Sequence, residues 1–475
     1  MNATQPTGMR LLEMLRSVDN NLGPRAPELQ TAVARLRADR SSALLPPLRN
    51  RLDGALLALE PAAAQASELS SAGRYAPSAL GGSSPQNYLI LLPNPSEIRP
   101  TGGFSGAIGT VTLAAGSPLN LEVKNQDDYN PLMKKRVDVP TPLARYLKFY
   151  KNGLELGDAG WDPDFPTSAQ TAEQLLNQAT AKSVDGTISI DPYAIAALLE
   201  VTGPVEVPGY GQFDKENFFS RLNVLVNASS GPGTGKAALP PISRAVLNSI
   251  LNVRGSDWLR LARALKIQAD QRHIQAYFHD PALAAATAGA HFDGALVAPG
   301  TDYLMLADAN VGSTKGDAFV KKSMQVLTEV HPELGVAWHQ VTVTYNMPLS
   351  TGPTDLLLNP GDGSYRDYLR FVLPQEALVT SLTTASGDKP TVGAVDAISL
   401  AHSHQIVGAF IRVPRGSGTS VVVTYEVPLT GAAYRLYVQK QAGVLELPVT
   451  ATVSFPGGVS KRLAGLTTDF VLSPG

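Results

Sequence analysis

The charged, glycine-rich stretch at residues 97–109 is the part of the sequence best equipped for chemistry. It reads Glu-Ile-Arg-Pro-Thr-Gly-Gly-Phe-Ser-Gly-Ala-Ile-Gly and follows the apolar run Tyr88–Leu92, which is typical of a strand buried on both faces. Glu97 and Arg99 therefore place two charges at the end of a predicted strand. Glycines let a ligand approach the backbone closely. The glycines we expect to bind a ligand are Gly102, Gly103 and Gly106.

The spacing of the glycines narrows the possible ligands. They recur at intervals of three from Gly103 to Gly109, which is not the dinucleotide-binding fingerprint. The β-branched residues Thr110–Thr112 follow them, so no helix is expected to begin there and bind a pyrophosphate. A glycine-rich turn between two strands is the alternative interpretation, and the sequence alone leaves both open.

Two acidic groups fall in predicted loops of the same region. Asp127 and Asp128 form one group, and the segment 158–164 carries the other. Carboxylates on loops at one edge of a sheet are suitable ligands for a hard cation beside phosphate oxygens. We therefore expect a metal site at Asp127 and Asp128, with magnesium as the cofactor. The alternative is that these aspartates only shape turns.

Composition sets limits on the class of protein. The 475 residues suggest about three domains at ~150 residues each. The net charge of −2 and the charged fraction of 17% argue against a nucleic-acid partner, which would require a basic face. The absence of cysteine excludes disulfides, thiolate metal sites and cysteine catalysis. No run of ~18 apolar residues predicts a membrane span, and the first residues do not resemble a signal peptide.

The hydrophobic patterns predict three parts that would position these residues. Residues 1–80 read as a helical segment, in which two helices pack on each other or on a partner. Residues 85–330 alternate strand and helix signals, which predicts an α/β domain with a mostly parallel sheet. Residues 335–475 contain short alternating strands between turns, which predicts an antiparallel, immunoglobulin-like β-sandwich.

A dense polar loop lies close to the second boundary. It reads Asp308-Ala-Asn-Val-Gly-Ser-Thr-Lys-Gly-Asp317 and precedes a helix or strand that begins near Ala318. Such a loop could line a site, and a turn at a domain junction explains it equally well.

Several segments resemble the bacterial domain-of-unknown-function family 4012, from about residue 87 to residue 473. They are Tyr88–Asn94, Glu97–Gly106, Asp162–Ala169, Val184–Pro192, Leu198–Val205 and Asp308–Asp317. Members of that family usually carry a membrane-spanning helix near the N-terminus and lie outside the cytoplasm. The resemblance implies an extracytoplasmic, cell-surface protein of the cell envelope, although this sequence lacks the expected span.

The order of these elements is also distantly similar to the LytR-CpsA-Psr phosphotransferases. Those enzymes attach glycans carried on polyprenyl pyrophosphate to the bacterial wall, with arginines on the pyrophosphate and an aspartate-held divalent cation. By position, the resemblance implies that Arg99 binds the pyrophosphate and that Asp128 holds the cation with Asp127. Glu97 is the candidate base. Lys124 is the basic residue of the segment that corresponds to an arginine-bearing stretch in those enzymes.

Two functions follow from these observations. In the first, the protein binds or transfers a glycan linked to polyprenyl phosphate or pyrophosphate. In the second, it is a non-catalytic surface protein for structure, adhesion or assembly, and its N-terminal helices form a homo-oligomer. Convergence of Glu97, Arg99 and Asp128 in a cleft would favour the enzyme. A buried ion pair between Arg99 and Glu97 would instead indicate a structural role.

Overall fold

The computed structural model describes residues 7–40, 45–135, 137–147, 153–227, 235–251, 253, 257–298, 300, 302–349, 352, 358–386, 389–392, 396–429 and 434–473. The chain forms two compact units. The first contains Met1–Tyr88, Thr110–Leu121 and Phe278–Gly289, and the second contains Leu89–Gly109, Glu122–Tyr277 and Ala290–Gly475. The three-part division expected from the sequence stays a prediction.

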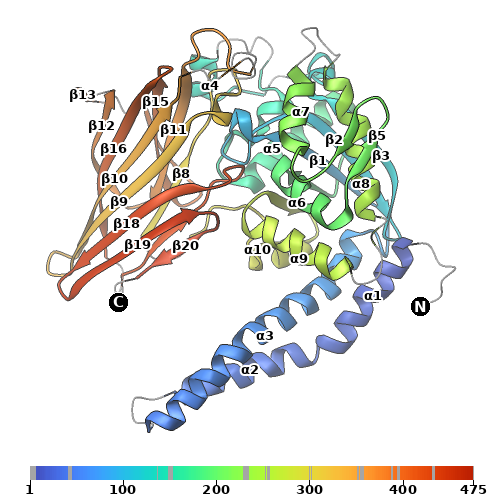
Figure 1. The fold of residues 1–475 in the computed structure, drawn as a ribbon, viewed down its shortest axis with the longest axis horizontal. Helices are drawn as coiled ribbons and strands as arrows, with labels where there is room; N and C mark the ends of the chain where they lie inside the picture. The colour runs from blue at the N-terminus through green and yellow to red at the C-terminus, as the bar shows by residue number, and fades with distance from the viewer. Residues whose placement is uncertain are drawn as a thin grey trace. The chain divides into compact units, whose positions relative to one another are not determined.

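The first unit is built mainly from helices, which confirms the helical N-terminal segment. Helices α1 (Thr7–Leu22) and α2 (Arg25–Ala38) both pack on the long helix α3 (Pro46–Ala79), as Figure 1 shows in blue. The contact with α2 is apolar and includes Val33, Leu56 and Ala63. Prolines at its first turn start α3, because their missing N–H groups need no partner there. None of the described helices is long and apolar enough to cross a membrane.

A five-stranded sheet with the order β3-β2-β1-β4-β7 forms the centre of the α/β region. Its strands are β1 (Gln86–Asn94), β2 (Phe104–Ala114), β3 (Ser117–Asn125), β4 (Gly186–Ile190) and β7 (Ile274–Phe278). The expectation of a mostly parallel sheet is wrong, and the region is mixed. Neighbouring strands β2 and β3 are joined by the two residues Ala115 and Gly116. So short a connection joins antiparallel strands only, because a parallel pair needs a long crossover.

The helices of the α/β region pack on apolar surface of the second unit. They are α4 (Thr141–Tyr146), α5 (Phe165–Thr180), α6 (Pro192–Thr202), α7 (Phe218–Asn227), α8 (Leu239–Leu251) and α9 (Asp257–Asp270), and a hairpin of β5 (Val205–Val207) and β6 (Gly211–Phe213) lies among them. Helix α5 buries Phe165, Ala172 and Leu175 in one core with Leu89 of β1. A further helix, α10 (Pro281–Gly289), belongs to the first unit and contacts α3.

Two larger sheets form the C-terminal part. The first has the order β13-β12-β16-β10-β9-β18-β19 and contains β9 (Lys321–His331), β10 (Val336–Met347), β12 (Leu378–Ser386), β13 (Lys389–Val392), β16 (Ser417–Pro428), β18 (Leu447–Phe455) and β19 (Gly458–Leu466). The second has the order β14-β15-β11-β8-β17-β20 and contains β8 (Asp302–Ala307), β11 (Tyr365–Pro374), β14 (Ala397–Ala401), β15 (His404–Val413), β17 (Leu436–Gln439) and β20 (Phe470–Leu472).

These sheets correct the expectation of a purely antiparallel, immunoglobulin-like sandwich. Most of the described pairings are antiparallel, but β18 runs parallel to β9 and β17 runs parallel to β8. The reason is long-range: strands near the C-terminus pair with the first strands of the same two sheets. Burial alternates along β10, so that Val341, Val343 and Tyr345 face a core shared with Leu369 and Phe371 of β11.

Candidate functional site

Arg99, the expected pyrophosphate ligand, is buried in the second unit with only 3% of its surface exposed. Its Nε donates a hydrogen bond to Asp158 Oδ1 over 2.6 Å, and its Nη1 donates to the carbonyl oxygens of Ile98 and Asn310 over 3.0 and 2.8 Å. The guanidinium lies 5.7 Å from the ring centroid of Phe104. Arg99 therefore links its own segment to Asp158 through an ion pair and to Asn310 through a hydrogen bond.

Glu97 makes a separate ion pair with the polar loop. Lys315 Nζ lies 2.6 Å from Glu97 Oε1, and the two side chains are 8% and 22% exposed. The two charges that stand two residues apart in the sequence therefore have different partners, Asp158 for Arg99 and Lys315 for Glu97. A buried ion pair between Arg99 and Glu97 would have been the sign of a structural role. Arg99 does form a buried ion pair, but its partner is Asp158.

The glycines after Arg99 form a tight turn against the end of β1. Gly102 and Gly103 have φ values of +125° and +146°, which disfavour any side chain. A Cβ atom on Gly103 would lie 2.2 Å from the carbonyl oxygen of Asn94, and one on Gly102 would lie 3.3 Å from Pro93. Gly106 follows in β2, where its nearest neighbour is the ring of Phe104. The protein's own backbone therefore occupies the space beside Gly103, which favours the turn interpretation.

The expected metal ligands lie on an exposed turn. Asp127 and Asp128 belong to a 3₁₀ turn at Gln126–Asp128, and both are exposed. Gln126 also accepts a hydrogen bond from the backbone of Gly157, so this turn borders the segment that carries Asp158. Within the part of the chain that the structure describes, no group of three or more His, Cys, Asp or Glu residues is arranged to hold a metal ion. Magnesium at Asp127 and Asp128 stays a prediction.

Lys124, the remaining cation of the predicted site, is exposed and has a partner on its own strand. Its Nζ lies 2.6 Å from Glu122 Oε1, and this hydrogen bond lowers the pKa of Glu122. Arg99 pairs with Asp158, Glu97 pairs with Lys315, and Lys124 pairs with Glu122. These ion pairs of the described residues do not bring Glu97, Arg99 and Asp128 together.

A charged cluster lies beside the polar loop, and the sequence predicts only those of its residues that belong to the loop. Lys322 Nζ lies 2.9 Å from Asp308 Oδ2 and 3.1 Å from Asp317 Oδ1. Tyr345 donates to Asp308 Oδ1 over 2.7 Å, and Tyr365 donates to Asp317 Oδ1 over the same distance. We call these residues, together with Asp367, the Lys322 cluster. The polar loop signalled two of its aspartates, whereas the other members come from strands that only folding brings together.

The protonation of the Lys322 cluster follows from its burial. Burial raises the pKa of Asp367 well above its usual range, and the neighbouring Asp308 raises it further. Burial alone would lower the pKa of Lys322, but the carboxyl groups of Asp308, Asp317 and Asp367 outweigh it, so that pKa is raised. The cluster therefore favours the protonated form of Asp367 and the ammonium form of Lys322.

Lys440 is a buried lysine whose pKa shifts in the opposite direction to that of Lys322. Its Nζ donates to the carbonyl oxygens of Gln271 and Gln441 over 2.7 and 3.1 Å. Burial lowers the pKa of Lys440 to about 7, against a smaller opposing effect of Asp191. The described hydrogen bonds of the ammonium group thus go to neutral carbonyl oxygens, which offset the cost of burying its charge less than a carboxylate would.

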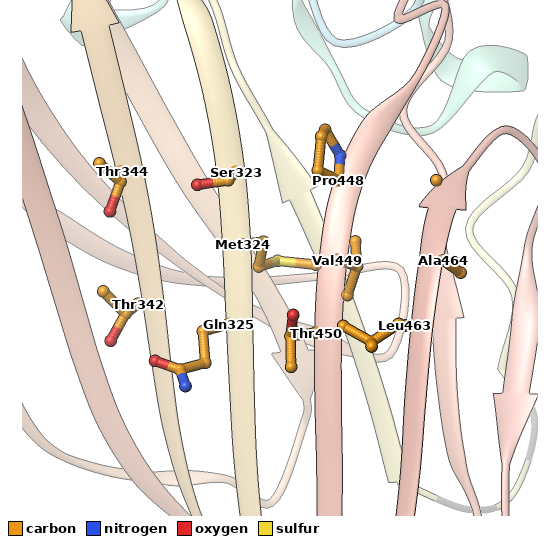
Figure 2. A pocket seen from close by; sticks show the side chains of 11 residues that line it. Ser323, Met324, Gln325, Thr342, Thr344, Pro448, Val449, Thr450, Leu463 and Ala464 are labelled. Atoms are coloured by element: carbon orange, nitrogen blue, oxygen red, sulfur yellow. The ribbon is translucent and has the colours of Figure 1, made fainter.

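A groove of about 550 Å³ lies on the seven-stranded sheet. Figure 2 shows the side chains that line it on β10, β9, β18 and β19, which lie side by side. The polar lining residues are Ser323, Gln325, Thr342, Thr344 and Thr450, and the remaining ones are Met324, Pro448, Val449, Leu463, Ala464 and Gly465. The lining carries no charged side chain. It therefore offers neutral hydrogen-bonding groups beside the exposed Leu463.

Comparison with known protein families finds a match for part of the chain. Residues 83–224 match the model of a family described as "Protein of unknown function (DUF4012)", which confirms the resemblance over that segment. Its extension to residue 473 and the similarity to LytR-CpsA-Psr enzymes stay predictions. No curated protein matches the sequence.

Among solved structures, the chain is similar to protein gbs0355 from Streptococcus agalactiae at 15% identity, over 44% of this chain and 74% of that one, with a TM-score of 0.29. It is also similar to a fragment of the putative transcriptional factor Lmo1026 from Listeria monocytogenes at 12% identity, over 44% of this chain and 77% of that one, with a TM-score of 0.23. At such TM-scores these likenesses carry no argument about function.

Proposed function

We propose that this protein is a non-catalytic cell-envelope protein that binds a neutral glycan in the groove of its seven-stranded sheet. The observation that carries the proposal is the lining of that groove, where hydroxyl and amide groups stand in place of charges. The extracytoplasmic location is proposed from the family resemblance and the match of residues 83–224. Adhesion or assembly at the cell surface is the role that suits such a protein.

The chemistry of the groove supports a carbohydrate ligand. Sugar hydroxyls both donate and accept hydrogen bonds, and the side chains of Thr342, Thr344 and Thr450 can do the same. Pro448 and Leu463 add apolar surface of the kind that packs against the C–H face of a sugar ring. The volume of about 550 Å³ lies within the range of small-molecule sites, roughly 300–1,000 Å³.

The surroundings of Arg99 favour this proposal over phosphate transfer. A guanidinium binds phosphate through its N–H groups, but Nε of Arg99 donates to Asp158 and Nη1 donates to backbone carbonyls. Taking Arg99 for a ligand would leave Asp158 buried without its partner, at a cost of several kcal/mol. Asp127 and Asp128 are exposed, in contrast to this buried pair.

The proposal is tested by titrating the purified chain with cell-wall glycan fragments in isothermal calorimetry. Thr450→Leu places an apolar side chain in the groove and is expected to weaken binding about tenfold or more, the equivalent of ~1.4 kcal/mol. Thr452→Leu is the matched control, because Thr452 lies on the same strand and face but outside the lining. Equal affinities of the two variants would contradict the proposal.

A second titration uses polyprenyl phosphate and pyrophosphate, each with and without magnesium. Our proposal expects no saturable binding. Magnesium-dependent binding that is lost in Asp127→Asn and Asp128→Asn variants, with their unfolding unchanged, would instead support the phosphotransferase expectation. Exposed positions are chosen for these variants because their substitution leaves the buried ion pair of Arg99 intact.

A further inference from the structure

We propose that Lys322 and Asp308 join in an intramolecular isopeptide bond, formed by the protein itself, that links the two sheets of the sandwich. The inference goes beyond glycan binding and does not depend on it. It rests on a nucleophile and an acyl group held in contact, a second acid beside them, and a cavity of water size at the same place.

The reacting atoms are already in contact. Lys322 Nζ lies 2.9 Å from Asp308 Oδ2, and the two side chains are only 13% and 2% exposed. Contact of this kind, held by a rigid core, replaces the encounter of two reactants and gives a large effective concentration. Asp308 directly follows β8, and Lys322 is the second residue of β9. The bond would therefore connect the first strand of one sheet to that of the other.

The neighbours of this pair suit the chemistry of amide formation. Tyr345 O–H donates to Asp308 Oδ1 over 2.7 Å, so it can stabilise the negative charge that develops on that oxygen. Asp317 Oδ1 lies 3.1 Å from Lys322 Nζ and can accept a proton from it. Asp367 is fully buried beside Asp308, and this burial raises its pKa well above the usual range, so it can serve as the proton donor.

A small cavity borders the pair and provides room for the product water. Its volume is about 20 Å³, enough for one water molecule. Asp308 and Lys322 line it, together with the apolar Leu306, Val444, Leu447 and Leu466 and the polar Gln439, Lys440 and Gln441. The low exposure of the two reacting side chains, 13% and 2%, limits contact with bulk water, which favours the amide over its hydrolysis.

The step is balanced within the protein. The Lys322 ammonium passes one proton to the Asp308 carboxylate, which gives an amine and a carboxylic acid. The Nζ lone pair then attacks Cγ of Asp308, and Asp317 takes a second proton from Nζ. Asp367 donates its proton to the departing Oδ2 hydroxyl, the Cγ–Oδ2 bond breaks, and water leaves. One amide and one water replace the ion pair, and a proton has moved from Asp367 to Asp317.

Denaturing mass spectrometry of the intact chain tests the proposal. The expected mass is lower than the sequence mass by one water molecule. Peptide mapping must place the loss in a branched peptide that contains Lys322 and Asp308. A full sequence mass would overturn the proposal, and so would a loss mapped to any other residues, such as a cyclised Asp-Gly pair or a link to Asp317.

Variants separate this bond from other dehydrations. Lys322→Arg and Asp308→Asn are compared with the native chain at a matched expression level. Lys322→Arg is expected to lose the branched peptide. Asp308→Asn is expected to lose it as well or to form it with loss of ammonia in place of water. Lys315→Arg is the matched control, because Lys315 is a buried lysine in the loop that follows Asp308, and its substitution should leave the loss of water intact. Asp367→Asn is expected to slow or stop the reaction. An unchanged rate in Asp367→Asn would overturn its role as the acid.

Discussion

Two buried cations of this protein, Arg99 and Lys322, lie in contrasting surroundings. Arg99 donates hydrogen bonds to the carboxylate of Asp158 and to the neutral carbonyl groups of Ile98 and Asn310. Lys322 contacts Asp308 and Asp317, and Asp367 adds a third carboxyl group near it. The buried ion pair of Arg99 with Asp158 is typical of a structural role. The site with an excess of acids contains both a nucleophile and groups that can move protons, so burial of charge alone does not identify chemistry.

Removal of Arg99 should have the largest effect on stability. Arg99→Met leaves Asp158 buried without its partner, which is expected to lower the free energy of unfolding by about 3–5 kcal/mol. Arg37→Met is the control, since its pair with Glu60 is exposed and is expected to contribute ~1 kcal/mol or less. Chemical denaturation measures both. Equal stability of Arg99→Met and the native chain would contradict the structural role of Arg99.

Lys440 extends the comparison to a buried cation whose described hydrogen bonds go to neutral carbonyl oxygens. Its folded pKa of about 7 lies below the unfolded value. Between these two values only the unfolded chain binds the proton, so stability falls as the pH is lowered, by about 1.4 kcal/mol per pH unit. The full penalty is reached below pH 7.

The Lys440→Met variant should remove this slope. Denaturation measured from pH 7 to pH 9 is expected to show the native chain gaining stability relative to Lys440→Met as the pH rises, with the variant the more stable at pH 7. A constant difference between the two proteins over this range would show that Lys440 keeps an ordinary pKa.

Substitution of Glu97 should have the smallest effect of the three. Glu97→Gln retains a hydrogen-bond acceptor for Lys315, and the carboxylate it replaces is partly exposed. We expect a loss of ~1 kcal/mol or less in thermal or chemical unfolding. A loss of unfolding free energy as large as that of Arg99→Met would mean that Glu97 and Arg99 belong to one network of charges. It would contradict the view that each residue has a separate ion pair.

Local features of the fold could be predicted from the sequence, and distant pairings could not. The apolar run Tyr88–Leu92 lies within β1, and the alternation around Val341 marks β10, because each pattern reports the burial of its own segment. The parallel pairs β17–β8 and β18–β9 left no local signal, since each depends on strands far apart in the chain.

The candidate site shows the same limit. The sequence singles out Arg99 and its glycines, but the partner of Arg99 is 59 residues away, where the aspartates of the segment 158–164 also fit an ordinary turn. The polar loop drew attention to Asp308 and Asp317. Nothing in the sequence placed Lys322 and Asp367 beside them, because their contact depends on the packing of β9 against β11 across the core.

One calorimetric series tests the central claim, that Arg99 supports the fold while the groove binds the ligand. Cell-wall glycan fragments are titrated into the native chain, Arg99→Lys and Thr450→Leu at a temperature where all three are folded. We predict that Arg99→Lys binds with native affinity despite a lower melting temperature, and that Thr450→Leu binds about tenfold more weakly or worse. Loss of binding in Arg99→Lys, with native affinity in Thr450→Leu, would contradict the account.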